Sequence, residues 1–403
     1  MIGSGKETVR SGTLAEVFFV FLRLGLVGFG GPAAHLALFR TVFTGERRWL
    51  EPAAYDELMA LCQFLPGPGS SQTAAAVGWV RAGPLGGVVA MTAFALPSLA
   101  IMGLAGWGAV AFAELIGTGL LAGLLAAAAG VVANAVLTMA RTQAASVPGA
   151  VIAFAAFAVV LFAGGFEWPL TGVQPAMILL GALAGLAFAA APGPAEEGAV
   201  RGGGRRGAIA ALVVFAGLLA GLPLVAGEDR ALMLADAVYR AGALVFGGGH
   251  VVLPLLEAGV VPDLVEEEAF LAGYGLVQAV PGPLFTFSAF IGAAAADGPA
   301  QALGYAALAA ASIFLPGLLL VYAALPFWAQ LKSSAAARRA LSGAASAVTG
   351  ILAAALIDPV IVSVPAEPIA YLIAIAAFLA LRFIKAPPPL VVLACGAAGF
   401  VLL

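Results

Sequence analysis

Long apolar runs separated by short polar stretches dominate the chain. Gly86–Val110, Gly117–Ala140, Gly149–Gly165 and Ala302–Ala324 are such runs, and each is long enough as a helix to cross a hydrocarbon core of about 30 Å. Alternating segments of about ten residues, the pattern of a membrane β-barrel, do not occur in the sequence. The pattern therefore predicts an all-α polytopic membrane protein, in which helices satisfy their own backbone groups within the lipid.

Glycine and proline interrupt some of these apolar segments. Leu14–Val42 is interrupted at Gly30–Pro32, and Pro52–Arg81 at Pro66–Pro68. Proline removes a backbone donor and disfavours helix before it. If Leu14–Val42 crossed the membrane completely, the basic residues at its two ends would lie on opposite faces, against the excess of Lys and Arg in cytoplasmic loops. We therefore expect both segments to be broken helical hairpins.

The interrupted pattern occurs twice along the chain. The matched positions, 215 to 220 residues apart, are Arg23 and Arg240, Phe29–Gly31 and Phe246–Gly248, Gln63–Pro68 and Gln278–Pro283, Leu96–Pro97 and Leu315–Pro316, Gly123 and Gly343, and Gly130 and Gly350. Such self-similarity indicates a duplicated structural unit. We expect a first copy at 1–191, a glycine-rich basic linker at 192–207 and a second copy at 208–403.

The remaining apolar segments are predicted to be full spans. In the first copy these are Pro84–Val110, Glu114–Ala140, Pro148–Phe166 and Gln174–Ala191. The second copy has a span at Ala208–Val225, hairpins at Leu232–Val260 and Glu268–Ala296, and spans at Gln301–Pro326, Ala335–Ile357, Ile369–Arg382 and Leu390–Leu403. Each copy thus has two broken-helix hairpins followed by spanning helices.

The distribution of charge predicts the orientation of the two copies. With the N-terminus in the cytoplasm, most of the 18 Lys and Arg residues fall on the inner side, whereas Arg230 and the acidic clusters Glu228–Asp229 and Glu266–Glu268 fall outside. This distribution follows the rule that cytoplasmic loops are enriched in Lys and Arg. The second copy then begins on the opposite face from the first, an inverted-topology repeat that many transporters share. The C-terminus is expected outside.

Composition supports a membrane protein and excludes several other classes. Of the 403 residues, 63% are hydrophobic and 10% are charged, whereas a soluble domain carries roughly 25% charge. The net charge of −3 gives no indication of a nucleic-acid partner. Cys62 and Cys395 are far apart in apolar surroundings, so neither a disulfide nor a metal site is indicated. No cofactor-binding motif occurs in the sequence.

Two arginines lie inside apolar segments at matched positions. An arginine costs about 2.5–3.5 kcal/mol there on insertion scales, so Arg23 and Arg240 require a reason to be present. Their matched positions favour a shared anion site. The alternatives are snorkelling to the interface and structural ion pairs with Asp236, Glu16 or Glu257.

The Pro-Gly-Pro breaks predict a second source of positive potential. A helix ending near Pro66, Gly67 and Pro68 is expected to be followed by a new helix near Gly69, whose free N–H groups and positive dipole end favour an anion. The alternative is a proline kink with hydroxyls bonded back to the backbone. Together with the arginines, the candidate substrate-binding residues are Gly30, Gly31, Gly69, Ser70, Ser71, Gln72, Thr73, Gly247, Gly248, Thr286 and Ser288, beside the second break at Pro281, Gly282 and Pro283.

Four ionisable residues are candidates for proton coupling. They are His35, Asp236, His250 and Glu257, because ionisable groups within membrane segments mark ion and proton pathways. Each has a structural alternative as a polar group that holds helices together. The two histidines do not align between the copies.

The motifs resemble those of the chromate ion transporter family. The resemblance rests on Phe29–His35, Leu65–Gln72, Phe246–His250 and Gln278–Pro283, and it covers both copies. It implies efflux of chromate across the bacterial inner membrane, driven by the electrochemical gradient, by the two-domain form of the family. His250 departs from the family pattern, where a tyrosine is expected.

A secondary transporter that exports chromate and confers chromate resistance is therefore the leading hypothesis. Sulfate is also a tetrahedral dianion, so a transporter of sulfate or another oxyanion is an alternative, as is a passive anion channel. An intramembrane enzyme is disfavoured, because the carboxylates occur singly or in outer loops. The expected partners are the oxyanion and the lipid bilayer, and the oligomeric state is left open, with a homodimer as one alternative.

Overall fold

The computed structural model describes residues 12–29, 31–111, 118–166, 168–189, 204–246 and 249–403. These residues form helices, and no strand occurs among them. The first copy contains α1 (Leu14–Val27), α2 (Gly31–Arg40), η1 (Thr41–Glu46), α3 (Pro52–Phe64), α4 (Gly69–Ala111), α5 (Thr118–Thr142), α6 (Val147–Gly165) and α7 (Leu170–Phe188). Helix α8 (Arg205–Val225) precedes the second hairpin pair.

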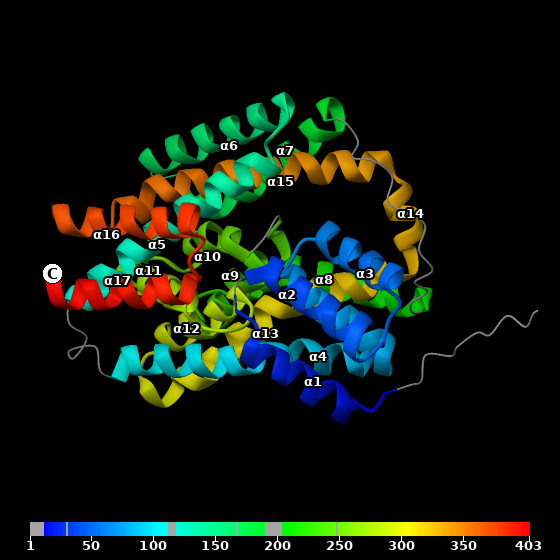
Figure 1. The fold of residues 1–403 in the computed structure, drawn as a ribbon. Coiled ribbons are helices and arrows are strands. Elements are labelled where there is room, and N and C mark those ends of the chain that lie inside the picture. Colours follow the sequence, from blue (N-terminus) through cyan, green and yellow to red (C-terminus); the bar gives the residue numbers. More distant parts are fainter. Residues whose placement is uncertain (1–11, 30, 112–117, 167, 190–203, 247–248) are drawn as a thin grey trace, which may run out of the picture.

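The second copy follows along the chain, coloured from green to red (Figure 1). It contains α9 (Arg230–Leu244), η3 (Gly249–Val251), α10 (Val252–Val260), α11 (Glu267–Val277), η4 (Leu284–Thr286), α12 (Phe287–Ala294), α13 (Pro299–Ala324), η5 (Leu325–Phe327), α14 (Trp328–Ser333), α15 (Ala335–Ala355), η6 (Leu356–Ile361), α16 (Pro368–Leu379), η7 (Ala380–Ile384) and α17 (Pro388–Leu402). In the described part, seven helices are long and apolar enough to cross a membrane. The predicted all-α multi-pass class is confirmed.

The predicted breaks interrupt the helices where glycine and proline occur. Helix α1 ends at Val27 and α2 begins at Gly31, while α3 ends at Phe64 and α4 begins at Gly69. Gly67 has φ +124° and Gly282 has φ +107°, dihedral angles that glycine adopts at little cost. The prolines on either side of each glycine then prevent the helix from continuing.

Several features differ from the sequence-based expectation. The segments predicted as full spans near the C-terminus are shorter apolar helices, Pro368–Ile384 and Pro388–Leu402, outside the seven spanning candidates of the described part. Helix α4 runs through the predicted hairpin end, but non-helical dihedrals at Ala82 and Gly83 divide it into a short and a long part. Helix α8 begins at Arg205, so Arg205 and Arg206 belong to a helix rather than to the linker. The short helix α14 was not predicted, because six residues carry too little periodic pattern to be recognised.

The two copies exchange helices. Helix α5 of the first copy packs against α16 and α17 of the second, and α15 of the second copy packs against α6 and α7 of the first (Figure 1). The duplicated glycines make this exchange possible, because a Cβ atom on Gly130 would lie 2.6 Å from Ala377 Cβ in α16, and one on Gly350 would lie 2.8 Å from the Phe157 amide in α6. Glycine lets two helix backbones approach this closely in a membrane.

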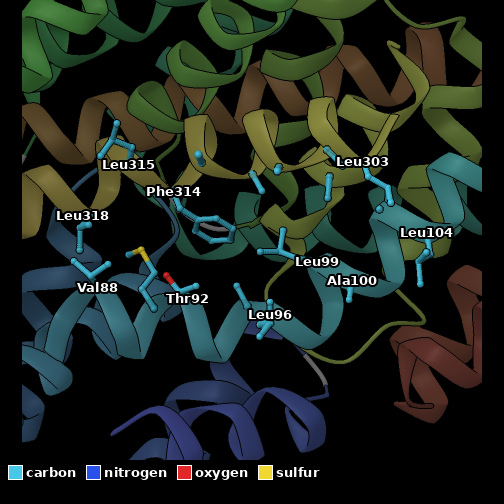
Figure 2. A pocket seen from close by; sticks show the side chains of 18 residues that line it. Val88, Thr92, Leu96, Leu99, Ala100, Leu104, Leu303, Phe314, Leu315 and Leu318 are labelled. Atoms are coloured by element: carbon cyan, nitrogen blue, oxygen red, sulfur yellow. The ribbon is translucent and has the colours of Figure 1, made fainter. Parts of the chain in front are cut away.

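Helices α4 and α13 run antiparallel. Gly103 lies against Ala306, and Gly87 lies against Tyr322, so an increasing number on one helix meets a decreasing number on the other. The two helices, with Ala289 of α12, line a cavity of about 700 Å³ whose walls are apolar except for Thr92 (Figure 2). A site for a hydrated dianion needs polar donors, so this cavity does not fit the predicted oxyanion chemistry.

Candidate functional site

The two Pro-Gly-Pro breaks each bind the end of a helix from the other copy. The Gly67 amide donates to the Val245 carbonyl at 2.8 Å, and the Gly282 amide donates to the Gly28 carbonyl at 2.7 Å. Gly67 and Gly282 are matched positions, as are Gly28 and Val245, 217 residues apart. Because helix ends carry carbonyls without intrahelical partners, each break satisfies one of them across the interface of the copies.

The Gln72 side chain hydrogen-bonds to the backbone at the first break. Its Nε2 donates to the Pro66 carbonyl at 2.8 Å and lies 3.3 Å from the Gly317 carbonyl of α13. The side chain is fully buried. Gln72 was a candidate substrate ligand, and in this structure its amide nitrogen is engaged by backbone of both copies.

His35 anchors the end of α1. Its Nε2 lies 2.9 Å from the Gly28 carbonyl, the same oxygen that accepts from Gly282. The ring is fully buried and makes an edge contact with Phe94. Since a carbonyl only accepts, Nε2 carries the proton. The His35 Nδ1 atom has no hydrogen-bond partner among the described residues.

A small polar cavity lies where the second break meets the first copy. Its volume is about 70 Å³. Gly31, the first residue of α2, and Asn134 of α5 contribute from the first copy. His250, Gln278 and Gly282 contribute from the second copy, with apolar side chains of α5, α11, η4, η7, α17 and the turn before η4 around them. The cavity therefore joins polar groups that lie far apart in the sequence.

The two arginines lie outside this cavity. Arg23 is exposed on α1, beside Phe19 and Leu26, and forms no ion pair with any described residue. Arg240 forms an ion pair with Asp236 one turn earlier on α9 and lines a separate recess against α7. The structure thus gives the two arginines different surroundings, and one of the structural ion pairs considered as an alternative is present.

The predicted hydroxyl donors are buried, and two of them bond to nearby backbone. Thr73 Oγ1 donates to the Gly69 carbonyl and Thr286 Oγ1 to the Pro283 carbonyl, both at 2.8 Å. Ser71 Oγ and Ser288 Oγ have no partner among the described residues. Ser70 is buried at the start of α4. Gly30, Gly247 and Gly248 lie outside the described residues.

Of the proton-coupling candidates, His250 alone lines the cavity. Its Nδ1 lies 2.9 Å from the Tyr274 hydroxyl, which holds the ring in place. Asp236 is buried against Arg240, and Glu257 is partly buried in α10. Neither of these two carboxyls lines the cavity.

Sequence reasoning did not select Gln278 and Asn134 as site residues. A signal for Gln278 was present, because it opens the duplicated Gln-x-x-Pro-Gly-Pro block. For Asn134 the only sequence signal was its position as a polar residue within an apolar span, which is a weak indication of function.

Broken helices that meet across two sequence copies beside a polar cavity are typical of membrane transporters. This fold and site define a multi-pass helical membrane transport protein. Within that class, the chain belongs to the chromate transporter family, whose profile matches residues 15–186 and 232–400. An oxyanion is the substrate type that this membership implies.

Three similar proteins align over most of the chain. The chromate transport protein of Cupriavidus metallidurans is 27% identical over 411 residues, covering 98% of this chain and 94% of that protein. The chromate transport protein of Pseudomonas aeruginosa is 30% identical over 362 residues, covering 85% and 80%. The probable chromate transport protein of Synechococcus elongatus is 28% identical, covering 86% and 84%. No solved structure matches the chain.

Proposed function

We propose that the protein is a secondary transporter that exports chromate across the bacterial inner membrane, using the electrochemical gradient, and thereby confers chromate resistance. The observation that carries this proposal is the polar cavity at the start of α2, where both copies contribute donors. The similarity to chromate transport proteins supports chromate as the oxyanion. Sulfate, a dianion of similar shape, is the competing substrate.

Opposite orientation of the two copies is part of the proposal. The matched helices α4 and α13 run antiparallel, which supports an inverted repeat. With the N-terminus in the cytoplasm, the C-terminus lies outside, and alternating access follows from rocking of one copy against the other. Helix α5, which packs against α16 and α17 of the second copy, also lines the cavity through Val131 and Asn134, and therefore links this movement to the cavity.

Arg23 and Arg240 supply charge in this proposal. A helix end provides only about half a positive charge, so helix ends alone leave a dianion incompletely neutralised. Each arginine lies four residues before the end of its helix, Val27 for α1 and Leu244 for α9. Neither guanidinium lines the cavity; Arg23 raises the potential from the end of α1, and the Asp236 carboxylate offsets the Arg240 charge in this structure. The proposed assembly is a homodimer, which cross-linking of the protein in proteoliposomes tests.

Flux in proteoliposomes tests the function. Labelled chromate is loaded under imposed pH and voltage gradients, with protein-free liposomes as the control and sulfate as the competitor. We expect saturable uptake that accumulates chromate against its own gradient when a driving gradient is imposed. Flux that only dissipates the chromate gradient would indicate a channel. Flux of sulfate but not of chromate would refute the proposed substrate.

A further inference from the structure

The polar cavity is the right size for one small anion. Its volume of about 70 Å³ is several times the roughly 10–15 Å³ of such space that one water requires. Its walls come from α2, α5, η3, η4, η7 and α17, and from the end of α11 with the turn that follows it. At Gly31 the space is open, since a Cβ atom built there would have no neighbour within 4 Å. The start of α2 therefore faces room for a ligand.

Gln278 provides an independent indication of a ligand. Its side chain is 6% exposed and lines the cavity. The amide faces the Tyr274 hydroxyl, but Nε2 has no partner at hydrogen-bonding distance among the described residues. A buried donor without an acceptor loses its hydration with no compensation. An acceptor that enters the cavity removes this cost.

The chemistry of the walls selects an anion. None of the described residues that line the cavity is acidic. The start of α2 contributes Gly31 to the wall, and the first N–H groups of a helix have no intrahelical acceptor. These donors lie at the positive end of a ten-residue helix. Asn134 adds an amide from α5.

The matched location in the first copy differs in its chemistry. Gln63, the counterpart of Gln278, is exposed rather than buried. At the first break the Gln72 side-chain amide donates to the Pro66 carbonyl. The matched position 215 residues later is Phe287, whose side chain has no amide. The duplication has therefore diverged so that the unsatisfied donor lies at the second break.

We propose that this cavity is a binding site, defined as the oxyanion site, for one tetrahedral oxyanion without its hydration shell. The side chains of Gln278, Asn134 and His250 bind the oxygens of the anion, and the start of α2 faces it. The proposal rests on the proposed function and names the site where the transported anion is bound. Tyr274 holds His250 through Nδ1, which leaves Nε2 as the ring nitrogen for the ligand. The oxyanion site is asymmetric, because most of its side-chain donors belong to the second copy.

Equilibrium binding of chromate to the purified full-length protein in nanodiscs tests the oxyanion site. Gln278→Leu removes the donor and is expected to raise Kd by about 10- to 100-fold, the range for a hydrogen bond to a charged group. Gln278→Glu keeps the shape but places a carboxylate against the dianion, and is expected to weaken binding at least as much. Gln63→Glu makes the same change at the matched exposed position, and is expected to leave Kd within about twofold.

Thermal unfolding with and without chromate separates a binding role from a structural one. We expect Gln278→Leu, which replaces a buried unpaired amide with an apolar side chain, to unfold at or above the parent's temperature without chromate and to lose the stabilisation that bound chromate gives. If folded Gln278→Leu and Gln278→Glu variants both bind chromate like the parent, the proposal of the oxyanion site is overturned. If the parent binds sulfate but not chromate, the proposed substrate is wrong. Sulfate binding by the same variants then tests the oxyanion site. A parent that binds no tetrahedral oxyanion refutes both proposals.

Discussion

Replacement of Gly282 by alanine perturbs the second break in two separable ways. The residue has φ +107°, a conformation that costs a residue with a Cβ atom about 1–3 kcal/mol. The new Cβ would also lie 2.6 Å from Ser98 Oγ and 3.2 Å from Ser98 Cβ. Overpacking of this kind costs about 1–3 kcal/mol. Together the two effects predict a loss of about 2–6 kcal/mol in the free energy of unfolding.

Two further variants isolate the two contributions. Gly83 has φ +72° and open space where its Cβ would be, so Gly83→Ala carries backbone strain without a clash. Ser98→Ala removes the closest contact, so the double variant Gly282→Ala/Ser98→Ala is expected to recover part of the overpacking cost. This coupling between neighbouring sites is what a double-mutant cycle measures.

Thermal unfolding of purified, monodisperse protein in nanodiscs is the assay. The expected order of melting temperatures is parent, then Gly83→Ala, then the double variant, and Gly282→Ala lowest. A Gly282→Ala variant that melts with Gly83→Ala, and that Ser98→Ala does not rescue, would refute the reasoning. The break would then not be packed against α4 as described.

Three other predictions concern charge, packing and topology. Arg23→Ala is expected to lower chromate flux about tenfold or more while Arg23→Lys keeps part of it; parent-like flux in folded Arg23→Ala contradicts the charge role. Gly350→Ala should lower the free energy of unfolding by about 1–3 kcal/mol, whereas Gly217→Ala, with open space around it, should not; equal melting temperatures would count against the exchange of helices. Single cysteines at Arg47 and Glu267 should react with impermeant reagents from opposite faces, and labelling from one face would rule out the inverted arrangement.

Local chemistry explains what the sequence determined. Helix class, the positions of the breaks and the duplication follow from apolar run length and from the dihedral preferences of glycine and proline, which act within a few residues. Thus the end of α3 at Phe64 and the start of α4 at Gly69 agree with the expectation. The inclusion of Gly31, Gly282 and His250 among site candidates came from the same local patterns, and these three line the cavity.

Tertiary structure decided which matched residues share an environment. Gln63 and Gln278 occupy the same position in the repeat, yet one is exposed and the other lies buried in the cavity. Arg240 is ion-paired while Arg23 is exposed. Matched positions in the two copies share a local backbone conformation. Their burial and hydrogen-bond partners, however, depend on the helices that pack around each side chain. Because α5 and α15 exchange partners between copies that have diverged, matched residues meet different neighbours, and a single sequence does not contain that information.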